Sequence, residues 1–178
     1  MTGAAVRLVR PTVATFDAAL DSDERLATEL GVEVVPGWAT FAAALEHTRN
    51  SMAAGTSDPV WGSRLFIAGD PPELVGWDGF KGAPKGGAAE IGYEIAEPRQ
   101  GLGLATAAAR AMTAEAFADP AVERVIAHTL CEWNASNRVL KKVGFVFAGE
   151  AVERDTPVWQ FAIHRNDHNE GEENDQRP

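Results

Sequence analysis

The sequence predicts an α/β protein with one mixed β-sheet, and three observations lead to this prediction. Segments in which apolar and polar residues alternate are typical of strands, and other segments carry apolar residues at helical spacing. Proline and glycine fall between these segments. Along the chain the order is strand, two helices, three strands, helix, strand, helix and two strands. Helices interspersed among strands in this way indicate a sheet covered by helices in layers.

The predicted elements of the N-terminal half are separated by breaks that contain proline. Pro11 ends the first strand, Pro36-Gly37 separates two helices, and Pro71-Pro72 joins two strands. These elements are a strand at 6–10, helices at 14–30 and 38–53, and strands at 63–70 and 73–82.

The C-terminal half is dominated by an alanine-rich helix, which has no proline and no internal glycine. The predicted elements are a strand at 88–96, this helix at 104–117, a strand at 122–130, a short helix at 136–143 and a closing hairpin. We expect residues 1–163 to form one domain, and the polar, acidic residues 164–178 to form a disordered tail.

The composition narrows the functional classes. The formal net charge of −10 argues against nucleic-acid binding and suits a cationic substrate. The single cysteine, Cys131, excludes a disulfide framework, and the four histidines show no metal-ligand spacing, so we expect no metal. The chain shows neither a signal-peptide core nor a long uncharged apolar stretch. We therefore expect a cytoplasmic protein without a membrane partner.

A glycine-containing loop before the alanine-rich helix predicts a phosphate site. Backbone N–H groups at a helix start lack intrahelical partners, and glycine lets an anion reach them. In the sequence QGLGLA of residues 100–105, no Gly-Lys-Ser/Thr follows, which excludes a Walker loop. A dinucleotide fingerprint needs a small residue three positions after its second glycine, and the chain has Thr106 there, which argues against a dinucleotide site. Gln100, Gly103 and Ala105 match the coenzyme A pattern Gln/Arg-x-x-Gly-x-Gly/Ala, and a turn that only connects two elements is the alternative.

Four motifs follow one another at a specific spacing. They are GFKGAP (79–84), AEIGYEI (89–95), QGLGLAT (100–106) and AHTLCEWNASNRVLKKVGF (127–145). Together they resemble the GNAT superfamily of N-acetyltransferases, in particular its RimJ/RimL-like branch. The resemblance implies a three-layer fold, with one mostly antiparallel sheet of six to seven strands flanked by helices. It also implies acetyl-coenzyme A as donor, an amine as acceptor and a homodimer.

The resemblance further implies which residues bind coenzyme A. The strand backbone at Glu94 and Ile95 lines the pantetheine arm, Asn134 contacts this arm from the other side, and Arg138 or Lys141 reaches the nucleotide phosphates. The amides of the loop hold the pyrophosphate, through Gln100, Gly101, Leu102, Gly103, Leu104, Ala105 and Thr106. For Asn134, capping of the following helix is the alternative role.

One departure from the family pattern concerns the acid that protonates the leaving thiolate. Other branches place a tyrosine five residues before the last motif phenylalanine, where this chain has Leu140. Its only tyrosine is Tyr93, so a tyrosine acid at the usual place is excluded. The resemblance puts Ser136 near the sulfur, and we expect it to serve the thiolate, with helix capping as the alternative.

The acceptor side is predicted from strand alternation, which puts Glu90, Gly92 and Glu94 on one face and Tyr93 on the core face. Glu90 is the expected general base, acting through a water, and an ordinary solvated carboxylate is the alternative. Backbone amides of the same strand are expected to stabilise the thioester oxygen.

Three further side chains are ring-containing residues near the motifs or in the predicted N-terminal helices. Trp38 and Trp133 are expected to bind the acceptor, although aromatic residues at helical spacing, such as Trp38, more often belong to a core. His128 is expected to be structural.

The leading hypothesis is an N-acetyltransferase that passes acetyl directly from the thioester to a primary amine, on a protein N-terminus or a small molecule. The alternative is a non-catalytic module that binds or senses acyl-coenzyme A. A nucleotide-binding oxidoreductase is a weaker third hypothesis. Acceptor specificity depends on the N-terminal helices and the loop at 82–88, which carry no diagnostic motif.

Overall fold

An eight-stranded sheet with helices on both faces forms the computed structural model, which describes residues 4–168. In chain order the elements are β1 (Arg7–Val9), α1 (Val13–Asp21), α2 (Asp23–Leu30), β2 (Glu33–Val34), α3 (Ala42–Ala53), β3 (Ser63–Ala68), β4 (Glu73–Phe80), β5 (Ala88–Ile95), η1 (Glu97–Arg99), α4 (Leu104–Phe117), β6 (Arg124–Leu130), α5 (Ala135–Val143), β7 (Val146–Glu153) and β8 (Thr156–His164).

The sheet follows the order β1-β3-β4-β5-β6-β8-β7, and β2 pairs with β4 outside this path. The β5–β6 and β2–β4 pairs are parallel, and the other pairs are antiparallel. The predicted mixed and mostly antiparallel sheet is therefore confirmed. The strand that the sequence did not predict is β2, because two residues are too short to show an alternating pattern.

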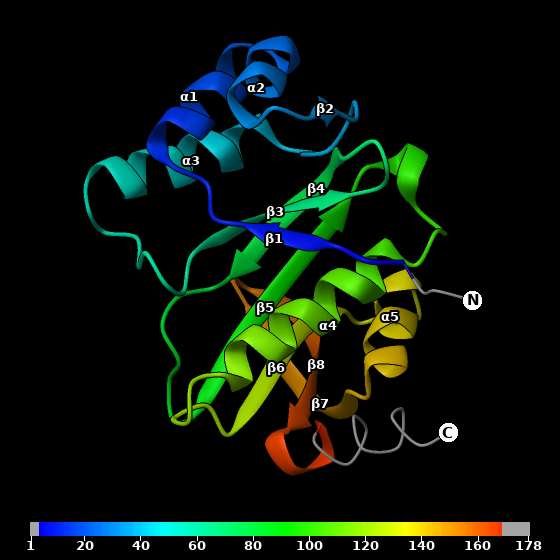
Figure 1. The fold of residues 1–178 in the computed structure, drawn as a ribbon. Coiled ribbons are helices and arrows are strands. Elements are labelled where there is room, and N and C mark those ends of the chain that lie inside the picture. Colours follow the sequence, from blue (N-terminus) through cyan, green and yellow to red (C-terminus); the bar gives the residue numbers. More distant parts are fainter. Residues whose placement is uncertain (1–3, 169–178) are drawn as a thin grey trace.

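The helices form two outer layers around the sheet (Figure 1). α4 packs on one face, where Ala108 and Met112 meet Ile91 of β5. α1, α2 and α3 pack on the other face, where Phe16 and Leu26 belong to one cluster with Trp77 of β4. Because neighbouring strand residues point to opposite faces, one strand contributes to both cores. This arrangement confirms the predicted three layers.

The sheet opens between β5 and β6. Their parallel pairing ends at Glu90 and Ile126, although β5 continues to Ile95 and β6 to Leu130. Beyond Glu90, β5 pairs with β4 along its other edge. Within residues 4–168, no strand pairs with the β6-facing edge of 91–95, so its backbone groups can bond a ligand.

Two of the predicted helices differ from the observed ones. The predicted helix at 14–30 is split at Ser22, whose side chain accepts a hydrogen bond from the Arg25 amide at 3.2 Å and caps α2. The predicted helix at 38–53 begins only at Ala42, because residues 36–40 form turns and bends and Phe41 has an extended backbone. No helix within the described range is long and apolar enough to cross a membrane.

The predicted tail begins later than residue 164. His164 is the last residue of β8, and the Arg165 guanidinium donates to the carbonyls of Phe117, Asp119 and Val122 over 2.6–3.0 Å. These bonds tie residue 165 to the segment after α4, so the predicted boundary after residue 163 is wrong. Residues 169–178, the remainder of the predicted tail, lie outside the described residues.

Candidate active site

The loop before α4 has the geometry of an anion site. Gly101 and Gly103 have φ angles of 75° and 80°, a left-handed conformation that glycine adopts without strain. Gly103 is the N-cap of α4 and makes no side-chain capping bond, so the first amides of the helix point outward without an intrahelical partner. The Gln100 amide group donates to the Ile95 carbonyl at 3.0 Å and ties the loop to the end of β5.

A cavity of about 550 Å³ extends from this loop to the open edge of β5. Of the predicted coenzyme A-binding residues, Glu94, Ile95, Gln100, Gly101, Gly103, Leu104, Ala105, Thr106 and Arg138 line it. Leu102 and Asn134 are not among its lining residues, and the Leu102 side chain is 60% exposed. The cavity wall also carries the cations Arg99 and Lys142, which suits a ligand with several phosphates.

The start of α5 explains the position of Asn134. The Asn134 Oδ1 accepts hydrogen bonds from the amides of Ser136 at 2.9 Å and Asn137 at 3.2 Å, so Asn134 is the N-cap. The Asn137 side chain in turn accepts from the Asn134 amide at 2.7 Å and donates to Thr129 of β6 at 2.8 Å. Helix capping, the alternative considered for both Asn134 and Ser136, therefore applies to Asn134 and not to Ser136.

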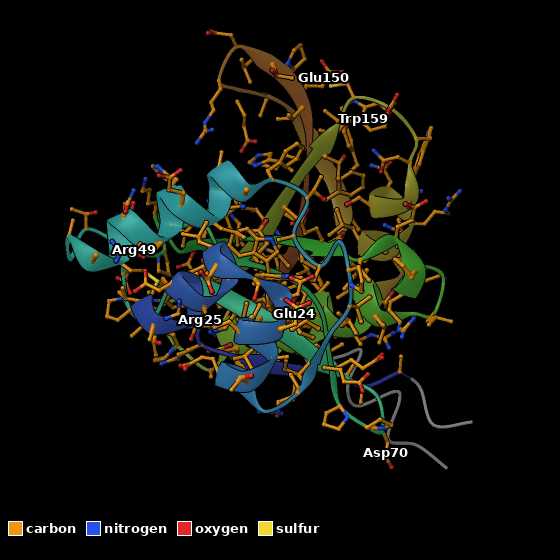
Figure 2. All side chains as sticks on the ribbon, turned by 90° about the horizontal axis from the view of Figure 1, so that it is seen from above. Glu24, Arg25, Arg49, Asp70, Glu150 and Trp159 are labelled. Carbon is orange, nitrogen blue, oxygen red and sulfur yellow. The ribbon has the colours of Figure 1, made fainter. Side chains whose placement is uncertain are left out.

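Trp133 and Lys141 lie on the surface rather than in the cavity. The Trp133 side chain is 65% exposed and packs edge-on against Trp159 at 5.9 Å, while the Lys141 Nζ lies 4.3 Å above the Trp133 ring. Figure 2 shows Trp159 beside Glu150 on the β7–β8 hairpin. The prediction that Lys141 reaches the phosphates is wrong, because the next residue, Lys142, is the one that lines the cavity.

Tyr93 and Ser136 meet at the cavity end near the open strand edge. The Tyr93 Oη and the Ser136 Oγ are 2.9 Å apart, and Tyr93 lines the cavity. Burial raises the pKa of Tyr93 to about 12, although the hydrogen bond to Ser136 lowers it somewhat. Tyr93 is therefore a protonated hydroxyl group near neutral pH. Strand alternation predicts only that Tyr93 lies on the core face, because it gives the face of a side chain but not its partner on α5.

The opposite face of β5 carries an ion pair at Gly92. The Lys81 Nζ donates to both carboxylate oxygens of Asp78 at 2.7 Å. A Cβ atom at position 92 would overlap Asp78 Oδ2 and would lie 2.9 Å from the Lys81 Nζ. Asp78 has a φ of 144°, which is rare outside glycine. Burial raises the pKa of Asp78 and the neighbouring Glu94 and Glu90 raise it further, whereas Lys81 lowers it, with a net upward shift.

Glu90 lies on the same face as Gly92 and contacts His128. The Glu90 Oε1 is 3.0 Å from the His128 Nδ1, the Glu153 Oε1 is 2.9 Å from that nitrogen, and the Gln160 Nε2 is 3.0 Å from the other ring nitrogen. Glu90, His128 and Glu153 form a group of described residues whose ligand atoms are close enough to hold a metal ion. An N–H at Nδ1 shared between the two carboxylates accounts for the same geometry without one.

Two other predicted site residues have side chains that make internal contacts: Glu94, whose backbone is predicted to line the pantetheine arm, and Trp38, which is predicted to bind the acceptor. The Glu94 carboxylate accepts hydrogen bonds from the Trp77 indole and from the Thr40 amide, the latter at 3.0 Å. Trp38 is only 4% exposed, packs edge-on against Trp77 at 6.1 Å and bonds Asp23. The prediction that Trp38 contacts the acceptor is therefore wrong, since it belongs to the core beneath α1–α3.

Comparison with known proteins identifies the fold and the family. A family model described as "Acetyltransferase (GNAT) domain" matches residues 6–146. The chain belongs to the GNAT acetyltransferase family. A relative among known proteins is the uncharacterized N-acetyltransferase YjdG of Bacillus subtilis (strain 168), which is 26% identical over 151 residues, covering 83% of this chain and 90% of YjdG.

Solved GNAT structures share the architecture at low sequence identity. The aminoglycoside acetyltransferase AAC(6')-Ib in complex with coenzyme A has a TM-score of 0.65 and 17% identity, covering 96% of this chain and 99% of that chain. Mycobacterium smegmatis RimJ in complex with CoA-disulfide has a TM-score of 0.60 and 22% identity, covering 90% of this chain and 82% of that chain. At these identities the likeness establishes the GNAT fold.

Proposed function

We propose that this GNAT protein is an acetyl-coenzyme A-dependent N-acetyltransferase whose acceptor is a primary amine, on a small molecule or a protein N-terminus. The observation that carries the proposal is the cavity of about 550 Å³ that joins the α4 start to the open edge of β5. The end of the cavity at the α4 start suits a diphosphate, and the end at the open edge of β5 suits a thioester. The motif order supports a RimJ/RimL-like cytoplasmic enzyme as part of the same proposal.

The residues along the cavity fit coenzyme A. The amides of residues 103–106 would bind the pyrophosphate, because they carry the positive end of the α4 dipole. Arg138 and Lys142 from α5 would bind the remaining phosphate group. The edge of β5 at Glu94 and Ile95 would line the pantetheine arm.

Acetyl-coenzyme A, when bound, supplies an acetyl group activated as a thioester. Amides at the open edge of β5 would donate to the thioester oxygen as it becomes negative, and one such donor commonly contributes ~3 kcal/mol. Glu90 would take the proton of the amine through a water molecule, and its hydrogen bond to His128 holds the carboxylate on the Gly92 face of β5.

The leaving thiolate is served from the other face of β5. Tyr93 and Gly92 are adjacent, so their substituents lie on opposite sides of the strand. The amine therefore approaches on the Gly92 side, whereas the Tyr93–Ser136 pair donates to the sulfur. Position 140, where other branches have a tyrosine, holds Leu140, which is fully buried. In our proposal Tyr93 of β5 takes the role of that tyrosine.

The proposal is tested by measuring free thiol when the protein is incubated with acetyl-coenzyme A and a panel of primary amines. Glu90→Gln is expected to lower kcat ~100-fold or more and to leave the affinity for acetyl-coenzyme A unchanged. Glu153→Gln is the matched control, because Glu153 contacts the same His128 nitrogen. If Glu90→Gln lowered kcat no more than Glu153→Gln does, Glu90 would be excluded as the base.

The alternative function, a non-catalytic sensor of acyl-coenzyme A, gives a different result in the same assay. A sensor would bind acetyl-coenzyme A in calorimetry and would release no thiol with any amine. The Tyr93–Ser136 pair favours the enzyme, because a binding module has no use for a proton donor at the sulfur.

A further inference from the structure

The Lys81–Asp78 pair lies where the acceptor amine of the proposed reaction is expected. The Lys81 Nζ is 2.9 Å from the position of a Cβ atom at Gly92, which is on the amine side of β5. Gly92 is the neighbour of Tyr93, which lines the end of the coenzyme A cavity. The flexible four-carbon stem of a lysine can move its nitrogen by several ångströms.

The missing side chain at position 92 explains why a lysine can occupy this place. Lys81 follows β4, and its amide donates to the Glu90 carbonyl at 3.0 Å, which fixes its backbone beside β5. Its side chain then turns back to Asp78, three residues earlier, and lies over Gly92. The Lys81 side chain is 45% exposed and that of Asp78 is 31% exposed, so the pair is open to solvent and to a ligand.

We propose that Lys81 is a self-acetylation site, whose side-chain amine accepts an acetyl group from acetyl-coenzyme A bound to the same molecule. This inference rests on the proposed function. Asp78 takes one proton from the Lys81 ammonium. The free electron pair on Nζ then forms an N–C bond to the acetyl carbon, while the C–S bond breaks and its electron pair leaves on the sulfur. The second N–H proton neutralises that thiolate, giving acetyl-lysine and coenzyme A thiol, and Asp78 returns its proton to solvent.

The charges around the pair favour this step. Partial burial disfavours the charged carboxylate of Asp78, and Glu94 and Glu90 on the same face add to this effect, which Lys81 offsets only in part. A carboxylate under these conditions accepts a proton from a bonded ammonium more readily than a solvated one does. Acetylation also removes the positive charge of Lys81. Asp78 then loses its ion-pair partner and can pair with an incoming cationic amine instead.

The test is to incubate the protein with isotopically labelled acetyl-coenzyme A without any amine and to map the modified peptides by mass spectrometry. Lys85 is the internal control, because it is an exposed lysine four residues away in the adjoining loop. We expect Lys81 to be labelled ~10-fold faster than Lys85 or more, because its amine is held beside the donor. After heat unfolding, the two lysines should be labelled at equal rates. Equal rates in the folded protein would overturn the proposal.

Two variants test the proposed proton transfer. Asp78→Asn keeps the shape of the side chain but cannot take the proton, so labelling of Lys81 should slow ~10-fold or more. If Lys81 were labelled as fast in this variant as in the wild type, the proposed role of Asp78 would be wrong. Lys81→Arg should abolish labelling at this position, whereas Lys85→Arg should leave it unchanged. Binding of coenzyme A and turnover of external amines are measured on the same protein. If both are normal while Lys81 stays unlabelled, the self-acetylation inference alone fails; if neither occurs, the proposed function fails too.

Discussion

Replacing Tyr93 by phenylalanine tests the division of the site into an amine side and a thiolate side. The substitution removes one oxygen, which is 2.9 Å from the Ser136 Oγ, and leaves the ring in place. Burial holds the pKa of Tyr93 at about 12. An ordinary thiol has a pKa of about 8.5. Transfer of a whole proton to the thiolate is therefore uphill by about 5 kcal/mol, at about 1.36 kcal/mol for each pKa unit.

This magnitude decides what Tyr93 does. In the proposed reaction Tyr93 would donate a hydrogen bond to the developing thiolate, directly or through Ser136, and would keep its proton. A hydrogen bond to a charged group contributes about 1.5–3 kcal/mol. Tyr93→Phe should accordingly lower the rate of acetyl transfer about 10- to 150-fold, because about 1.4 kcal/mol corresponds to a factor of ten.

The assay is the single-turnover rate of acetyl transfer at saturating acetyl-coenzyme A, since product release can hide the effect in kcat. The affinity for acetyl-coenzyme A should stay the same. Ser136→Ala should give a similar loss, and the double variant should be no slower than the worse single variant if the two hydroxyls act as one unit. A Tyr93→Phe enzyme within about twofold of the wild-type rate would refute the reasoning.

Two further predictions concern the cofactor and the fold. Lys142→Ala should raise the KM for acetyl-coenzyme A, whereas Lys141→Ala should not, because Lys142 lines the cavity and Lys141 covers Trp133; equal effects in steady-state kinetics would contradict this assignment. Glu115→Gln should lower the free energy of unfolding at pH 7 by ~2 kcal/mol in urea titrations, because Glu115 accepts two bonds from the buried Arg64 but is itself 30% exposed. Burial alone would raise the pKa of Glu115, but the arginine bonds outweigh it and lower the pKa. The difference between wild type and variant should therefore be largest above pH ~4.5 and disappear as the pH falls through the lowered pKa; a difference that is constant with pH would contradict the ion pair.

The phosphate end of the site could be predicted from the sequence because its chemistry is local. Gly101, Gly103 and the start of α4 are contiguous, and the geometry that exposes the helix amides depends on these few residues alone. Six of the seven residues at 100–106 that are predicted to bind coenzyme A line the cavity; Leu102 is the exception, because it is 60% exposed.

The reactive end depends on contacts between distant segments. Tyr93 and Ser136 are 43 residues apart, and Lys81 reaches Gly92 only because β4 and β5 pair Gly79 with Gly92. Lys141 and Lys142 are both cations on α5, but a step of one residue turns a helical side chain by about 100°. Sequence spacing therefore predicted the loop and helix start that line one end of the cavity. The register of β4 on β5 and the rotation of α5 against them decided which side chains stand at the other end, because neither is encoded by neighbouring residues.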